Sequence, residues 1–125
     1  NITPPTERRD DRHRDETIVQ LQIWLQDNLH REVRFDELAA QFGLSLRTFN
    51  RRFKAALGQT PGHYLREQRL QFACELLRDS DLTIGEVAAR SGFENANWFA
   101  QRFKQWSGST ARDYRRTVRG KLFGG

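Results

Sequence analysis

One segment of about thirty residues occurs twice in this chain, at 38–66 and again at 87–116. Once a one-residue insertion in the second copy is allowed for, eleven positions are identical. The identical pairs are Ala39/Ala88, Ala40/Ala89, Gly43/Gly92, Phe49/Phe99, Arg52/Arg102, Phe53/Phe103, Lys54/Lys104, Gly58/Gly108, Thr60/Thr110, Tyr64/Tyr114 and Arg66/Arg116. Chance rarely produces such agreement, so the chain is expected to contain the same structural device twice.

The first copy predicts a short helix, a glycine turn and a second, amphipathic helix. The short helix is expected over 36–42, and Gly43 follows it at the position where a positive φ is favoured. Ser45 can then cap a helix over 46–56. A turn of this length between two helices is typical of a helix-turn-helix.

The second copy repeats this pattern, and its short helix has a stronger N-terminal capping signal. Thr83 and Glu86 form a capping-box pattern, and Asn95 can cap a helix over 96–106. The first copy has Arg34 at the capping position, so its short helix lacks a capping hydroxyl and begins less securely.

Two further amphipathic stretches, 16–29 and 61–78, complete an all-α chain with a long helix between the copies. At about 1.5 Å per residue this central helix would span roughly 25 Å. We predict a linker at 1–15, a first helix-turn-helix subdomain at 16–60, a connecting helix at 61–78, a second subdomain at 79–116 and a frayed basic tail at 117–125.

The net charge of +5 indicates an anionic partner. From residue 97 to the end, seven Arg and Lys residues stand against the single acid Asp113, so the excess positive charge lies on the two copies, and especially on the second. A solvated basic face kept for solubility is the alternative interpretation. Matched basic blocks in two copies favour a ligand instead.

Several classes of protein are disfavoured. No apolar run is long enough to span a membrane, and no secretory signal begins the chain. Cys74 is the only cysteine, so an internal disulfide is excluded. We interpret Cys74 as a small core filler rather than a reactive thiol. His13, His30 and His63 lack metal-ligand spacing, so no metal or cofactor is expected. Because the first residue is Asn, we expect the chain to be part of a longer protein.

Helical rotation separates an apolar and a polar side in each second helix. In the helix expected over 46–56, Phe49 and Phe53 mark the inward side, with Leu46 beside them. In the helix expected over 96–106, the inward side is marked by Phe99, Phe103 and Trp106. The outward side chains are those that bond or touch base edges in a major groove. The candidate base-contacting residues are Arg47, Asn50 and Arg51, and Asn97, Ala100 and Gln101.

Other polar residues near these helices suit DNA phosphates. The candidate phosphate-contacting residues are Ser45, Arg52, Lys54, Thr60, Arg102, Lys104 and Thr110. Arg52 and Arg102 lie toward the core side, so each either reaches a phosphate or pairs within the protein; the sequence leaves both alternatives open.

The residues from Ile18 to Arg116, above all IGEVAARSGFENANWFAQRFKQWSGSTARDYRR, resemble the DNA-binding domain of the AraC/XylS family. The resemblance implies seven helices in two helix-turn-helix subdomains of the homeodomain-like three-helix type. It also implies a bacterial, cytoplasmic (nucleoid-associated) regulator, most often an activator that contacts RNA polymerase, with an effector or dimerisation domain upstream. The first copy is similar to the branch with a DJ-1/PfpI-like N-terminal domain. Ala111 departs from the family pattern, which has proline there.

We therefore predict a sequence-specific regulator of transcription that inserts two helices into successive major-groove segments of double-stranded DNA. The alternative is a protein-interaction module whose basic faces dock on an acidic partner such as an RNA polymerase subunit. The duplication favours DNA, because two matched faces suit a periodic ligand. An enzyme is not expected, since no catalytic constellation stands out.

Overall fold

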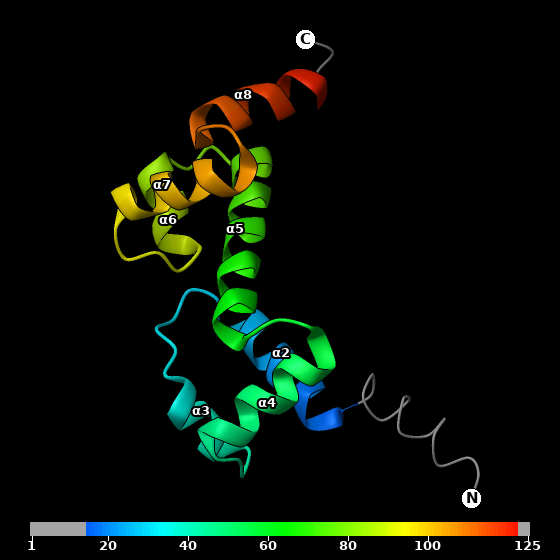
Figure 1. The fold of residues 1–125 in the computed structure, drawn as a ribbon. Helices are drawn as coiled ribbons and strands as arrows, with labels where there is room; N and C mark the ends of the chain where they lie inside the picture. The colour runs from blue at the N-terminus through cyan, green and yellow to red at the C-terminus, as the bar shows by residue number, and fades with distance from the viewer. Residues whose placement is uncertain (1–14, 123–125) are drawn as a thin grey trace, which may run out of the picture. The chain divides into compact units, whose positions relative to one another are not determined.

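The structure, a computed structural model, describes residues 15–122. Within this range the chain forms seven α-helices and no strand, which confirms the predicted all-α class (Figure 1). The helices are α2 (Glu16–Asp27), α3 (Phe35–Gln41), α4 (Leu46–Leu57), α5 (Pro61–Asp79), α6 (Ile84–Arg90), α7 (Ala96–Ser107) and α8 (Ala111–Leu122). None of these helices is both long and apolar enough to cross a membrane.

The described residues divide into two compact units. Unit 1 contains residues 15–28 and 32–66, and unit 2 contains residues 29–31 and 67–122. The helix α5 begins in unit 1 and continues into unit 2. Most of the predicted linker, residues 1–14, lies outside the described residues, as do residues 123–125.

The core of unit 1 is built around the two phenylalanines of α4. Phe49 and Phe53 are fully buried, and their ring centroids lie 5.7 Å apart in an edge-to-face arrangement. Phe53 also packs edge-on against Tyr64 of α5, at 5.4 Å. The other buried apolar residues of this unit are Ile18, Leu21, Leu25, Leu38, Ala39 and Leu65. Each phenylalanine therefore holds the inward side of α4 against the rest of the unit.

Unit 2 has the corresponding arrangement around α7. Phe99 and Phe103 are fully buried, with centroids 5.6 Å apart, and Phe103 meets Tyr114 of α8 at 5.5 Å. The rest of this cluster includes Leu70, Ala73, Leu77, Val87, Ala88, Phe93 and Ala111. The two copies are thus matched in their core contacts as well as in sequence.

The two glycine turns have the conformation that the sequence predicts. Gly43 and Gly92 have φ of 76° and 94°. The residue after each glycine donates its backbone N–H to the same position of the preceding helix, Leu44 to Ala39 O and Phe93 to Ala88 O, both at 2.9 Å. The predicted caps are also confirmed, and they begin α4, α6 and α7.

A pair of half-buried arginines shows that the repeat extends beyond the segment found by sequence identity. Arg69 Nε donates to Leu29 O (3.0 Å) and its Nη2 to Arg31 O (2.7 Å). Arg119 makes the same bonds, from Nε to Arg78 O (3.3 Å) and from Nη2 to Ser80 O (2.5 Å). The two arginines are fifty positions apart, which is the offset of the two copies after the insertion. The acceptors in each pair are forty-nine positions apart, which is the offset before the insertion. Each arginine satisfies carbonyls in the last turn of a helix or just beyond it, where intrahelical partners are lacking.

Some expectations about individual residues are wrong. The chain does not fray from Thr117, since α8 continues to Leu122 and Arg119 is held by the bonds just described. Leu46 and Trp106 are 42% and 38% exposed rather than buried. Leu46 is the first residue of α4, and Trp106 lies at the far end of α7 with its ring 5.9 Å from that of Phe103. Both stand at the ends of their helices, beyond the central phenylalanine contacts.

The two turn glycines should differ in their tolerance of a methyl group. Gly43→Ala meets no heavy atom within 4 Å, so only the left-handed backbone opposes it, at a cost of about 1–2 kcal/mol. Gly92→Ala would place its Cβ 2.1 Å from Leu29 O and 2.5 Å from Arg69 Nε, which adds about 1–3 kcal/mol through forced displacement. Urea unfolding of both variants measures the difference, and equal losses of stability would contradict the close approach at Gly92.

Candidate nucleic-acid interface

The outward side of α4 carries the three candidate base-contacting residues of unit 1. Arg47, Asn50 and Arg51 are all exposed, on the side of the helix opposite Phe49 and Phe53. Neither arginine forms an ion pair with any residue in the described range. Their guanidinium groups are therefore available to a ligand outside the protein.

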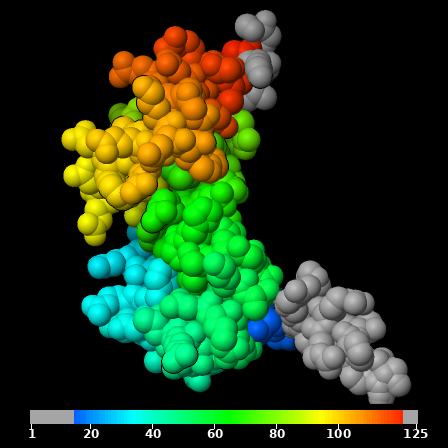
Figure 2. Space-filling model, in the orientation of Figure 1, coloured from blue at the N-terminus to red at the C-terminus, as the bar shows by residue number. Residues whose placement is uncertain are grey.

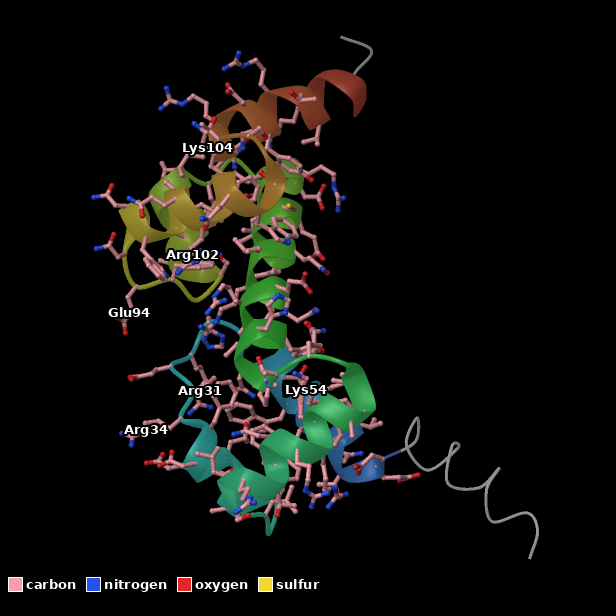
Figure 3. All side chains as sticks on the ribbon, viewed as in Figure 1. Arg31, Arg34, Lys54, Glu94, Arg102 and Lys104 are labelled. Carbon is pink, nitrogen blue, oxygen red and sulfur yellow. The ribbon has the colours of Figure 1, made fainter. Side chains whose placement is uncertain are left out.

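The outward side of α7 has the same position and a different chemistry. Asn97, Ala100 and Gln101 are exposed, while Phe99 and Phe103 are fully buried. The yellow-to-orange surface of α7 and its flanking turns lies on the visible face of Figure 2. Lys54 of α4 and Lys104 of α7 are exposed too, so this matched pair of lysines is accessible in both units (Figure 3).

The candidate hydroxyl groups are engaged as helix caps. Ser45 Oγ accepts from Thr48 N (3.1 Å) and donates its own proton to Thr48 Oγ1 (3.0 Å). Thr60 and Thr110 accept from the backbone N–H of His63 and Asp113, at 3.2 and 3.0 Å. In this arrangement Thr48, rather than Ser45, has a hydroxyl proton to donate outward at the start of α4. Thr48 is not among the phosphate-contacting residues predicted from the sequence. Its position three residues after a serine cap is the signal that could have indicated its contact with Ser45.

Arg52 is occupied within unit 1. Its Nε donates to Asp15 Oδ2 (3.0 Å) and its Nη2 to Asp15 Oδ1 (2.6 Å), a two-bonded pair whose side chains are 33% and 15% exposed. The Arg52 guanidinium lowers the pKa of the Asp15 carboxyl, with a further lowering from the Ile18 N–H. Asp15 also caps α2. Of the two alternatives open for Arg52, the structure has the internal pair.

Arg102, the counterpart of Arg52, has no carboxylate partner among the described residues. Its guanidinium carbon lies 4.1 Å from the ring centroid of Trp98, a cation–π arrangement. Its Nη1 donates to Gln105 Oε1 at 3.4 Å. Arg102 and Lys104 leave α7 on different sides (Figure 3). The charge of Arg102 is therefore held in place without being neutralised.

Comparison with known proteins shows to which family these two helix-turn-helix units belong. The family model described as "Helix-turn-helix domain" matches residues 38–117. The DNA-binding domain of AdpA, a global transcriptional factor solved in complex with a target DNA, is 33% identical to this chain. Its TM-score is 0.82, and the match covers 87% of this chain and 98% of that one. The chain belongs to the AraC/XylS family. A Chromobacterium violaceum regulator with an AraC-type DNA-binding domain is also similar, with 25% identity, a TM-score of 0.78 and coverage of 83% and 93%.

A curated member of the AraC/XylS family matches only in part of its length. The transcriptional activator RhaS of Klebsiella pneumoniae is 42% identical over 101 residues, which are 81% of this chain and 36% of RhaS. The chain thus spans about a third of this relative.

The departure from the AraC/XylS pattern at Ala111 is accommodated, because Ala111 is buried in the core and the Thr110 hydroxyl caps the first turn of α8.

The Asp15–Arg52 pair should make the stability of unit 1 depend on pH. Asp15→Asn retains a capping oxygen but loses the charge, at a cost of about 0.5–1 kcal/mol for this partly exposed pair. Because the folded-state pKa of Asp15 lies below its ordinary value of 3.8, the native chain has this stability in full above pH 3.8 and loses it as the pH falls further. Urea unfolding of both proteins at pH 6 and at about pH 3 measures the gap, which should narrow at the lower pH. A gap of the same size at both values would contradict the ion pair.

Proposed function

We propose that this chain is a sequence-specific domain for double-stranded DNA in a regulator of transcription, and that α4 and α7 each enter a major groove. The most direct support for this proposal is an arrangement of buried and exposed side chains that both units share. Each unit fixes one side of a helix with two buried phenylalanines and leaves the other side exposed, polar and free of carboxylate partners within the described residues. An α-helix with side chains is about 10–12 Å across, which suits a major groove about 12 Å wide.

The two helices would recognise bases by different contacts. Arg47 and Arg51 can donate two bonds to guanine O6 and N7, and Asn50 can pair with adenine N6 and N7. In unit 2, Asn97 and Gln101 suit adenine, and Ala100 can touch a thymine methyl group. We therefore infer that α4 supplies more of the guanine recognition and that α7 recognises A·T pairs.

The residues around these helices would hold the DNA backbone. Lys54 and Lys104, one turn beyond the base-contacting residues, supply charge for phosphates, and Thr60 and Thr110 stand at the starts of α5 and α8. Ser45 positions Thr48 for the same task. We assign Arg52 a structural role instead, since Asp15 neutralises it.

The domain would serve a longer regulator. Because the matched part of RhaS is about a third of a protein named as a transcriptional activator, we infer activation, an effector or dimerisation domain upstream, contact with RNA polymerase and a place at the bacterial nucleoid in the cytoplasm. These inferences rest on membership of the family.

Selection of bound duplexes from a random library tests the proposal. We expect the 125-residue chain to enrich two half-motifs about 10 base pairs apart, one for each helix. Arg47→Ala and Arg51→Ala should each relax the preference at one half-motif only and cost on the order of 1–3 kcal/mol on the selected site. Equal loss on selected and scrambled duplexes would reassign these arginines to phosphate. Failure to enrich any motif would favour a protein partner.

The two matched lysines should govern the dependence of affinity on salt. Lys54→Ala and Lys104→Ala should each reduce the slope of log K against log salt concentration by about one, because each removes one phosphate contact. The measurement is a titration of a labelled duplex between about 50 and 200 mM salt. Arg78→Ala is the control, since Asp79 already neutralises Arg78 at the end of α5. A slope that either lysine variant leaves unchanged would contradict its contact with a phosphate.

A further inference from the structure

The exposed indole of Trp98 is not accounted for by the core of unit 2. Trp98 is 46% exposed, the second highest value among the exposed large apolar side chains of the described residues. Its counterpart in the first copy is the small, polar Thr48. Tryptophan is enriched at interfaces, so the exposed indole beside the Arg102 guanidinium favours a role in binding.

Trp98 lies at one edge of the proposed base-contacting side of α7. Successive residues of a helix are about 100° apart, which places Trp98 beside Gln101 on one flank and Lys104 on the other. Figure 3 agrees, since Arg102, which stacks on Trp98, and Lys104 project from different sides of α7. A helix that fills a major groove meets a phosphate backbone on each flank, so this second flank needs its own backbone contact.

We propose that Trp98 and Arg102 form one contact with the DNA backbone, on the flank of α7 opposite Lys104. The indole face holds the Arg102 guanidinium toward the phosphates. In this assignment Trp98 is a positioning residue and Arg102 is the charged contact. The inference rests on the proposed function, because it requires α7 to lie in a groove.

The two copies would then differ in how they hold the backbone. In unit 1 the matched arginine is neutralised by Asp15, and Thr48 is left as an uncharged donor. In unit 2 the matched arginine retains its charge and is held by an aromatic face. The milder base-contacting set of α7 is thereby joined to the stronger backbone contact.

Salt titrations of matched variants test this assignment. Arg102→Gln should reduce the slope of log K against log salt concentration by about one. Arg52→Gln, its matched control, should leave the slope unchanged. Trp98→Leu should weaken binding roughly three- to tenfold on selected and scrambled duplexes alike, the range expected for a partly desolvated cation–π contact. Trp98→Phe, which retains an aromatic face, should recover part of this loss.

A double-mutant cycle separates positioning from independent contacts. Trp98→Leu combined with Arg102→Gln should bind DNA about as well as Arg102→Gln alone, while thermal unfolding midpoints stay close to that of the native chain. An unchanged slope for Arg102→Gln, or strictly additive losses, would overturn the assignment. If Arg51→Ala still loses base preference in the same assays, the proposed function stands without it. If the native chain binds no duplex at all, both are overturned.

Discussion

The structure depends on two pairs of phenylalanines spaced one helical turn apart. Phe49 with Phe53, and Phe99 with Phe103, are fully buried and in ring contact. Burying each such side chain contributes about 1.5–3 kcal/mol. Because the two members of a pair lie on the same side of the helix, rotating that helix by one residue would turn both away from the core. The buried pair thus fixes which residues face solvent, and the polar side chains of α4 and α7 need no contacts of their own to be placed.

The distribution of ion pairs is consistent with this division of tasks. The described pairs lie at helix ends and on the core-side flank, for example Asp15–Arg52 beside α2 and Asp81–Arg119 beside α8. The outward sides of α4 and α7 have none among the described residues. Intramolecular carboxylates there would compete with DNA for the same guanidinium and ammonium groups. A surface that keeps its cations unpaired gives up little stability, since exposed pairs contribute only about 0–1 kcal/mol.

Much of the fold could be predicted from the sequence because its causes are local. The glycine turns, the caps at Ser45, Thr83 and Asn95, and the phenylalanine spacing each depend on residues a few positions apart. The bond between Asp15 and Arg52 joins residues 37 positions apart, and Asp15 closes a charged stretch that reads as a linker. No periodicity indicates such a partner. The exposure of Leu46 and Trp106 was missed for a related reason: an angle on a helical wheel does not tell where the neighbouring elements end.

The candidate site was predictable to the level of helix faces and no further. The outward positions follow from the inward phenylalanines, and all six candidate base-contacting residues are exposed. The difference between Arg52 and Arg102 was not visible in the sequence, since both are arginine in matched positions. It arises from what lies beside them, a carboxylate in one copy and an indole in the other.

The matched bonds of Arg69 and Arg119 indicate how the duplication is assembled. The carbonyls that Arg69 binds follow α2, and those that Arg119 binds lie in the last turn of α5 and just after it, so α5 stands to the second copy as α2 stands to the first. The same α5 also supplies Tyr64 and Leu65 to the core of the first copy. It is the last helix of one copy and the first helix of the next, which is why two four-helix modules need seven helices in the described chain and not eight. In its connectivity the domain is a repeat array of two overlapping members, and a sequence change in α5 is constrained by two cores at once.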